Sequence, residues 1–364
     1  MIKKIIKNLD ELKEFSKDIE KNIFWFSNIL IYWEVWAWKT TFTKFFLENI
    51  WIEKKIKSPS YALENFYEIP KNSNFFSKKY SKIWHYDIYR LEKNQNLESL
   101  EENFNSDDLV LVERAEKLNS KPKSWIELFF KKLSEKNPET WENFREIEIK
   151  FFWTSFTENE IKKIFEKYKT PKNIQKHTAQ VANTAIQVAE NFIKNWKILD
   201  KKLIYTAARL HDVIKYIDFV EKMKPKKNKN WELEYFDILW NKISEETILF
   251  WKKMKKKFNW LTHEKAWWKL FYELWFKEIW KVISSHWLKQ AFEGFSTFEE
   301  KIVYYWDSTT MHDKKISVEE RIEDVKNRYW KWKDWKISEE KSNFYKKIIK
   351  KNLEVEAELK KFIL

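Results

Sequence analysis

Cysteine is absent from this chain of 364 residues, and histidine occurs only six times. The absence of cysteine excludes disulfides, thiolate zinc sites and a cysteine nucleophile. A metal ion bound by this protein must therefore take its ligands from histidine, aspartate and glutamate side chains.

Long apolar segments are also missing. No run approaches the roughly 20 apolar residues that span a bilayer, and the N-terminus lacks the basic start, apolar run and small-residue cleavage site of a signal peptide. We therefore expect a soluble, cytoplasmic protein with no membrane partner. A length of 364 residues is enough for two domains, each with a core of its own.

Glycine is almost absent as well. The chain has one glycine and 23 tryptophans, whereas an ordinary glycine content of about 7% would give on the order of 25 glycines. Trp51, Trp196 and Trp275 each follow an apolar helical segment, where a left-handed glycine commonly ends a helix. Certain uncultivated bacterial lineages translate UGA as glycine, so we interpret most tryptophans here as glycines mistranslated from UGA. The alternative is a tryptophan-rich protein without workable turns.

The chain is strongly basic, with a formal net charge of +14 and a pI near 9.3. Such a charge suits an RNA-associated protein, because Lys and Arg neutralise phosphates. Lysine and asparagine are abundant while arginine is sparse, which A+T-rich codon usage also produces. We favour a solvated lysine surface over a dedicated nucleic-acid patch.

A phosphate-loop motif follows the first apolar strand. The run Ile29-Leu30-Ile31-Tyr32 predicts a buried strand, and the nine residues after it are Trp33, Glu34, Val35, Trp36, Ala37, Trp38, Lys39, Thr40 and Thr41. With glycine in place of tryptophan they match GxxxxGK[ST], which predicts an ATP-binding loop. Lys39 would reach the β and γ phosphates, and Thr40 would bind Mg²⁺. Indoles in the loop would block the phosphates, so only the glycine form should bind ATP.

Three further motifs narrow the class of ATPase. Ser58-Pro59-Ser60-Tyr61, His85-Tyr86-Asp87-Ile88-Tyr89-Arg90 and Leu109-Val110-Leu111-Val112-Glu113-Arg114 follow in order. Together with the phosphate loop they resemble the TsaE-type ATPases of tRNA threonylcarbamoyladenosine synthesis, over residues 1 to 152. The resemblance implies that Ser58 and Ser60 form a switch near the γ-phosphate, that Asp87 assists Mg²⁺ and that Glu113 is needed for hydrolysis.

Each of these assignments has an alternative. Asp87 could form a surface ion pair with the arginine nearby, and Glu113 could cap the next helix. We interpret His85 as structural. The family usually has tryptophan where this chain has Arg114, which puts a partner contact at that point in doubt.

The second half is predicted to be helical, because apolar residues from Ile161 onward follow helical spacing. Six side chains of types that can bind a metal lie along it, most of them in apolar helical surroundings: His177, His211, Asp212, His263, His286 and Asp307. The series resembles the ligand set of HD-type phosphohydrolases, over residues 160 to 335. The resemblance implies two metals bridged by Asp212, and it matches Lys215 to the family's substrate-neutralising lysine. Ile214 stands where one HD subgroup has glycine.

Ordinary helix packing is the alternative for the six residues, and a solvated helix lysine is the alternative for Lys215. The ligand types suit Mn²⁺, Fe²⁺, Mg²⁺ or Co²⁺, and the implied substrate is a small phosphoester. His312-Asp313 lacks the helical setting, so we expect it on the surface. Residues 336 to 364 have the apolar spacing of an amphipathic helix.

The expected fold is an α/β P-loop NTPase domain followed by an all-α HD domain. By resemblance, the first hypothesis is an ATP- and Mg²⁺-dependent component of the machinery that modifies tRNA position 37, fused to a metal-dependent phosphohydrolase. TsaB–TsaD-type proteins would be its partners, and tRNA would be contacted indirectly through that complex. The second hypothesis is a nucleotide-switch binding module whose HD half is sensory and not catalytic.

Overall fold

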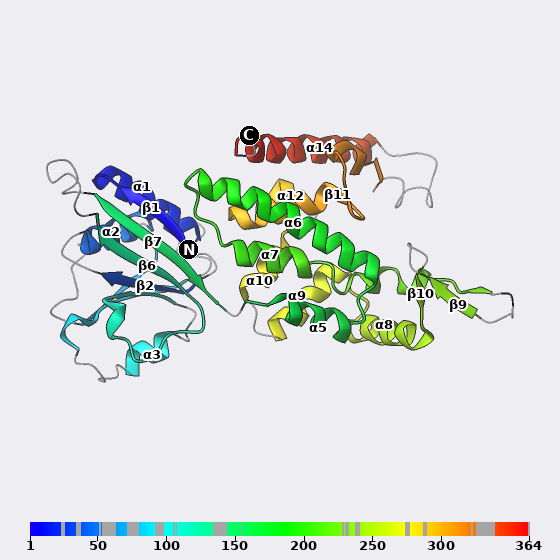
Figure 1. The fold of residues 1–364 in the computed structure, drawn as a ribbon, viewed down its shortest axis with the longest axis horizontal. Coiled ribbons are helices and arrows are strands. Elements are labelled where there is room, and N and C mark those ends of the chain that lie inside the picture. The colour runs from blue at the N-terminus through cyan, green and yellow to red at the C-terminus, as the bar shows by residue number, and fades with distance from the viewer. Residues whose placement is uncertain are drawn as a thin grey trace. The chain divides into compact units, whose positions relative to one another are not determined.

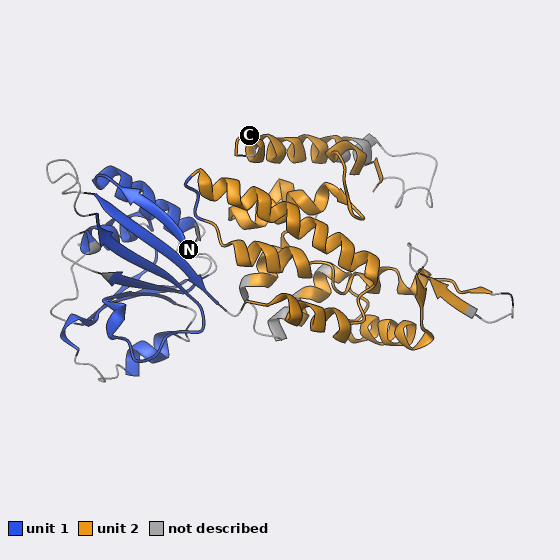
Figure 2. Ribbon diagram, in the orientation of Figure 1, with its two compact units in different colours: residues 1–154, 196–198 blue, residues 155–195, 199–364 orange. Residues whose placement is uncertain are grey.

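The computed structural model divides the chain into two compact units, residues 1–154 with 196–198 and residues 155–195 with 199–364 (Figure 2). The structure describes all residues except 23–25, 34–37, 51, 53–62, 71–79, 92–97, 105, 107, 134–143, 154, 228, 230–232, 237–240, 274–276, 287–289, 322, 325–338 and 363–364. None of the helices in the described ranges is long and apolar enough to cross a membrane.

The first unit is built on a seven-stranded sheet in the order β1-β7-β6-β2-β5-β4-β3 (Figure 1). The four strands β6, β2, β5 and β4 are parallel, and the antiparallel strands lie toward the two edges. The strands are β1 (Ile2–Ile6), β2 (Asn28–Trp33), β3 (Glu64–Glu68), β4 (Lys82–Asp87), β5 (Leu109–Glu113), β6 (Trp125–Lys132) and β7 (Arg145–Phe152).

The central strands are continuous apolar runs, as expected for parallel strands covered on both faces. Ile29, Leu30 and Ile31 of β2 are fully buried, and so is every residue of the β5 run from 109 to 112. The buried strand predicted at residues 29 to 32 is therefore confirmed as part of β2. An α/β fold follows, because a parallel strand pair needs crossover segments to cover it.

The helices of this unit are α1 (Leu9–Asn22), α2 (Lys39–Asn49) and α3 (Glu98–Phe104), with short 3₁₀ turns η3 (Ile88–Arg90) and η4 (Ala115–Lys117). α1 packs on α2, with the rings of Phe15 and Phe42 5.7 Å apart. Five residues separate the end of β2 from the start of α2. Its N-terminus therefore lies at the carboxyl edge of the parallel strands, where α/β proteins bind their ligands.

The second unit is mainly helical, as the sequence predicted. Its helices are α5 (Glu158–Lys167), α6 (Lys172–Lys194), α7 (Lys201–Leu210), α8 (Glu245–Lys257), α9 (His263–Glu273), α10 (Lys277–Ser284), α11 (Gln290–Glu293), α12 (Phe298–Ser308) and α14 (Glu339–Lys360). Two short 3₁₀ turns, η5 (Lys215–Asp218) and η6 (Val220–Lys222), follow α7. The helices α6, α7, α10 and α12 pack on one another around the core.

Local sequence sets the ends of several helices. Thr157 and Glu160 form a capping box at the start of α5, in which each side chain binds the backbone N–H of the other residue. Asp200 caps α7 by accepting hydrogen bonds from two backbone N–H groups of the first turn. α14 buries Ile348, Val355 and Leu359, so its amphipathic pattern has a covered face.

The expectation of an all-α second half was wrong in detail. The described part of this unit also has a three-stranded sheet, β10-β9-β8, and a two-stranded one, β11-β12. The strands are β8 (Lys226–Lys227), β9 (Leu233–Phe236), β10 (Lys242–Ile243), β11 (Thr310–Met311) and β12 (Lys314–Lys315). Strands of two to four residues carry too few side chains to show an alternating pattern, so the sequence predicted only a loop around residues 222–230.

Within the described residues, Trp38, Trp196 and Trp260 adopt left-handed backbone conformations. Their φ angles are 71° at Trp38, 62° at Trp196 and 61° at Trp260. The indoles of Trp196 and Trp260 are 56% and 59% exposed, just beyond the ends of α6 and α8. This conformation costs a bulky residue about 1–2 kcal/mol and costs glycine nothing comparable. These angles support the interpretation of tryptophan as glycine, whereas Trp51 and Trp275 lie outside the described residues.

Candidate functional site

Five helical segments of the second unit bring six side chains to one place. His177 lies on α6, and His211 and Asp212 come directly after α7. The other three are His263 at the start of α9, His286 just after α10 and Asp307 on α12. All six are buried. Two overlapping groups result, and Asp212 belongs to both.

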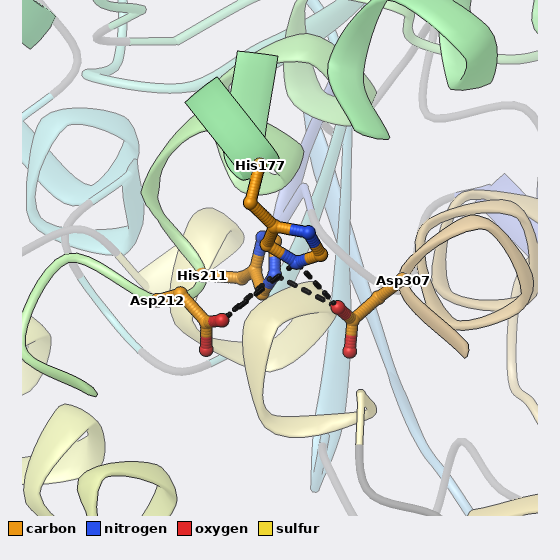
Figure 3. A group of neighbouring side chains, drawn as sticks. All are labelled: His177, His211, Asp212 and Asp307. Carbon is orange, nitrogen blue, oxygen red and sulfur yellow. Dashed lines mark hydrogen bonds and ion pairs between the residues drawn. The ribbon is translucent and has the colours of Figure 1, made fainter. Parts of the chain in front are cut away.

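The first group is shown in Figure 3, where two imidazoles point toward two carboxylates. His177 Nε2 lies 3.0 Å from Asp307 Oδ1 and 3.8 Å from Asp212 Oδ2. His211 Nε2 lies 3.1 Å from the same Asp307 oxygen and 3.6 Å from the same Asp212 oxygen. Spacings of about 3 to 4 Å suit ligand atoms that each lie about 2.1 Å from one ion.

The second group uses the other oxygen of the shared carboxylate. Asp212 Oδ1 lies 3.2 Å from His263 Nε2, and His263 Nε2 lies 3.4 Å from His286 Nε2. The two oxygens of Asp212 therefore face different histidine pairs. A carboxylate placed in this way can bridge two metal ions.

All four histidines use Nδ1 for a hydrogen bond away from the cluster. Nδ1 of His177 bonds the carbonyl of His312 at 3.0 Å, and Nδ1 of His211 bonds the carbonyl of Ala208 at 2.7 Å. His286 bonds the carbonyl of Ile283, and His263 bonds the carboxylate of Asp218. Because these partners are acceptors, each Nδ1 carries a proton, and in the neutral form of each imidazole the Nε2 lone pair is directed into the cluster.

In the neutral form, the lone pairs of the histidine Nε2 atoms therefore face carboxylate oxygens or other Nε2 atoms at close range. Nε2 of neutral His177 opposes a carboxylate oxygen of Asp307, and the Nε2 atoms of His263 and His286 oppose each other. Two acceptors repel unless a proton or a metal cation lies between them. Burial lowers the pKa of His177 and lowers that of His286 to about 4, which disfavours the proton. The residues therefore fit a metal cation at these positions.

The carboxylates are held in their charged form. Burial would raise the pKa of both, but Lys215 and the histidines outweigh it at Asp212, and His211 and His177 outweigh it at Asp307, so both pKa values lie well below the usual range. Burial also opposes the positive charge of His211. The carboxylates of Asp212 and Asp307 outweigh this effect of burial and raise the pKa of His211. Charged hard oxygens with imidazole nitrogens are the donor set for Mn²⁺, Fe²⁺, Co²⁺ or Mg²⁺.

Lys215 lies one turn beyond the shared carboxylate and contacts Asp212 through Nζ. Burial opposes its charge, but Asp212 and Asp307 outweigh burial and raise the pKa of Lys215. It is therefore a cation beside the cluster. His312 and Asp313 are exposed, as expected, although the backbone carbonyl of His312 binds His177.

In the first unit, two carboxylates end adjacent parallel strands. Asp87 is the last residue of β4, Glu113 is the last residue of β5, and the two are register partners. Glu113 is also the register partner of Ile31 on β2, close to where β2 leads to the phosphate loop. Both carboxylates are buried. They therefore lie at the edge of the sheet from which α2 starts.

Glu113 is held by two neighbours. Its Oε1 accepts a hydrogen bond from Thr43 Oγ1 on α2 at 3.0 Å and lies 3.0 Å from His85 Nε2. It does not cap the next helix, because Arg114 occupies the N-cap position of η4 with a φ of 62°. His85, interpreted from the sequence as structural, thus contacts the carboxylate predicted to act in hydrolysis.

Asp87 is buried rather than a surface ion pair. Its Oδ1 accepts a hydrogen bond from the backbone N–H of Tyr89 at 3.2 Å and lies 3.9 Å from Arg114 Nε. The Arg114 guanidinium also covers the ring of Tyr89 at 4.4 Å. Arg114 thus orders the turn beside Asp87.

The phosphate loop lies between β2 and α2. Trp38 immediately precedes α2 and has the left-handed backbone described above, and Thr40 is exposed at the helix N-terminus. Residues 34–37, the side chains of Trp33 and Lys39, and both Ser58 and Ser60 lie outside the described part of the structure. Strand, loop and helix N-terminus follow in the order that phosphate-binding loops need.

The comparisons with known proteins concern this unit. The family model of "Threonylcarbamoyl adenosine biosynthesis protein TsaE" matches residues 6–140. These residues are a TsaE family domain. The tRNA threonylcarbamoyladenosine biosynthesis protein TsaE of Haemophilus influenzae is 35% identical over 83 residues, which are 22% of this chain and 47% of that protein.

The chain thus spans about half the length of the curated relative that it matches. Among solved structures, the crystal structure of Bacillus subtilis YdiB is 23% identical, and the similarity covers 40% of this chain and 84% of that one at a TM-score of 0.28. The match of the TsaE domain ends at residue 140. The six-residue cluster of the second unit lies entirely beyond it.

Sequence reasoning missed two contacts that matter to these sites. Asp218 binds both Nδ1 and the backbone N–H of His263, the latter at 2.8 Å, and so orients that imidazole. Thr43 holds Glu113 from the next turn of α2. Asp218 is six residues from the His211–Asp212 pair, but its partner is 45 residues farther on, so only the folded chain reveals the contact.

Proposed function

We propose that the TsaE domain hydrolyses ATP as a component of the machinery that forms threonylcarbamoyladenosine at tRNA position 37, and that the second unit is an HD-type, divalent-metal phosphohydrolase. The substrate of the second unit is a small phosphoester. The two proposals rest on separate observations.

For the TsaE domain, the supporting observation is the pair of buried carboxylates, Asp87 and Glu113, at the strand ends beside α2. Lys39 and the loop backbone from 33 to 41 would bind the ATP phosphates, with Ser60 near the γ-phosphate. Thr40 and Asp87 would hold Mg²⁺. Glu113 would orient the attacking water, since Thr43 and His85 fix its carboxylate.

Partners follow from the family. TsaB–TsaD-type proteins would bind the TsaE domain, and tRNA would be contacted through that complex. The test uses the glycine-restored protein, defined as the full chain in which every tryptophan encoded by UGA is replaced by glycine. It should bind Mg²⁺–ATP, hydrolyse it slowly alone and turn over faster with TsaB, TsaD and tRNA. The Lys39→Ala form should not bind ATP, and the chain as written should not bind it either.

For the second unit, the supporting observation is that four buried histidines lie in two groups around Asp212, one of which also contains Asp307. His177, His211, Asp212 and Asp307 would hold one metal, and Asp212, His263 and His286 a second. Such metals lower the pKa of a bound water and clamp the oxygens of a phosphoester. Lys215, a cation on the rim, would neutralise the phosphate of the substrate.

Metal analysis of the full glycine-restored protein tests this assignment. We expect two divalent ions per chain in the parent and none in Asp212→Ala, because that carboxylate serves both positions. The Asp313→Ala variant, which removes an exposed aspartate outside the cluster, is the matched control and should keep both ions. A metal-free parent would reduce the six residues to helix packing. Bound metals with no hydrolysis of any phosphoester would favour the sensory alternative.

A further inference from the structure

A cavity of about 490 Å³ opens beside the metal-binding cluster of the second unit. His177 and Asp212 form part of its wall, so a molecule in the cavity would touch the residues proposed to hold the metals. The volume lies within the range of roughly 300–1,000 Å³ that small-molecule sites occupy. The cavity is therefore large enough for more than a phosphate group.

Two cations line the cavity close to the cluster. They are Lys215, which contacts Asp212, and Arg321, which lies 3.5 Å from Asp324. Their charges reinforce that of the proposed metals on one side of the cavity. The phosphate of a substrate would accordingly lie at this end.

The rest of the wall is largely apolar and aromatic. Phe219 and Met223 come from the segment around η6, Phe236 comes from β9, and Met311 comes from β11. All four are only partly covered by the protein. Aromatic faces and thioethers pack favourably on a flat ring. A polyhydroxylated sugar or a second phosphate would instead lose hydration against this wall.

The wall also contains a buried polar atom that lacks a partner among the described residues. Oδ1 of Asn173 on α6 is buried and has no hydrogen-bond partner in the described part of the chain, and Asn173 lines the cavity. A buried acceptor without a donor costs about 1–3 kcal/mol. A hydroxyl group on the ligand would satisfy it. The cavity thus offers places for a phosphate, a hydroxyl group and a flat ring.

The small sheet β10-β9-β8 supplies the aromatic end of the cavity. Figure 1 shows β9 and β10 extending beyond α8, away from the helical body. Phe236 ends β9 and is the register partner of Lys242 on β10, so strand pairing holds its backbone in place. This insertion therefore forms part of a specificity wall.

We propose that the cavity selects a phosphate monoester whose organic group is a flat aromatic ring on a hydroxylated linker, of the size of a nucleoside, and that Phe219 and Phe236 are its specificity-determining residues. This inference rests on the proposed phosphohydrolase function. In the reaction, water adds to phosphorus and the ester P–O bond breaks. The leaving oxygen takes up a proton, so the products are the alcohol and inorganic phosphate.

The experiment compares two probes on the full glycine-restored protein loaded with Mn²⁺. Adenosine 5′-monophosphate has the flat ring, whereas ribose 5-phosphate has the same phosphate and sugar without it, and neither has the phosphoanhydride that the TsaE domain would cleave. We expect kcat/KM at least 10-fold higher for the nucleotide. Phe236→Ala and Phe219→Ala should each raise its KM several-fold and lower the ratio of kcat/KM between the nucleotide and ribose 5-phosphate. The matched control Phe292→Ala, at an exposed residue of α11, should change neither.

The outcomes separate the two proposals. Equal kcat/KM for the two probes, unchanged by Phe236→Ala, would overturn this inference and leave the phosphohydrolase standing. A protein that binds no metal and cleaves neither probe would overturn the phosphohydrolase. In that case calorimetric titration with adenosine 5′-monophosphate decides the cavity: binding that Phe236→Ala weakens supports the assigned ligand class, and no binding overturns it.

Discussion

The carboxylate of Glu113 is oriented by two neighbouring side chains, and this orientation bears on its function. Thr43 and His85 both contact Oε1 of this buried carboxylate. One oxygen is thereby fixed, which orients the whole carboxylate with respect to the start of α2. A group held in this way suits the positioning of a water molecule better than the binding of ATP itself.

Replacement of Glu113 by alanine in the glycine-restored protein should therefore separate binding from chemistry. We expect the Kd for Mg²⁺–ATP to change little and the hydrolysis rate to fall by roughly 100-fold, the usual loss when a positioned acid–base group is removed. Glu116→Ala is the control, because Glu116 is exposed three residues away. Unchanged turnover in Glu113→Ala would contradict the assigned role.

The backbone φ angles of the tryptophans predict which of their codons are UGA. Trp38, Trp196 and Trp260 have positive φ angles, so their codons should be UGA. Trp84 lies inside β4 and its indole N–H donates to Asp108 Oδ2 at 3.1 Å, so its codon should be UGG. Sequencing the gene checks all four. UGG at the three left-handed positions would show that these tryptophans are genuine.

Helices and strands differ in how well the sequence predicted them. The buried run of β2 and the apolar spacing of α5 were sufficient, because burial constrains every core-facing residue of such elements. The strands β8 to β12 were missed because they are short and partly exposed. The six cluster residues could be proposed from their types and order. Their supporting contacts, such as Asp218 with His263, depend on tertiary structure.

The start of α12 contains a buried carboxylic acid with a measurable consequence. Glu299 is 1% exposed, accepts a hydrogen bond from the backbone N–H of Asp200 at 3.0 Å, and burial raises its pKa to about 7. The folded state therefore binds a proton more tightly than the unfolded state, whose pKa is about 4.3. The contribution of the protonated Glu299 side chain to the free energy of unfolding is therefore complete below about pH 4.3, and it is lost as the pH rises through about 7.

Glu299→Gln should remove this pH dependence, because the amide keeps an acceptor for Asp200 and has no charge to bury. We expect it to raise the free energy of unfolding by about 3–4 kcal/mol at pH 8 and by only about 1 kcal/mol at pH 5. Urea unfolding at the two pH values measures both. The exposed Glu293→Gln serves as the control, and an equal gain at both pH values would point to packing instead of titration.

At the scale of the molecule, each unit contains every described residue of its own candidate site. The TsaE domain holds Thr43, Asp87 and Glu113, and the second unit holds the six-residue cluster and its cavity. Loss of one site should not remove the ligands of the other. The sequence predicted this division because the two motif sets never interleave.

The two activities should therefore be separable in the full chain. Asp212→Ala is expected to abolish phosphoester hydrolysis and leave the basal ATPase rate within about 2-fold, since additivity holds for sites without shared partners. Lys39→Ala should do the reverse. Both rates measured on the same preparations decide the matter, and loss of both activities in either variant would show that the sites depend on each other.

The left-handed backbone at Trp38 also has a consequence for expression of the gene. If that angle marks a glycine encoded by UGA, an expression host that treats UGA as a stop signal releases a peptide of at most 37 residues. Such a peptide ends before α2 and contains only two strands of the seven-stranded sheet. Production of this protein in an ordinary host therefore requires a rewritten gene with glycine codons at these positions.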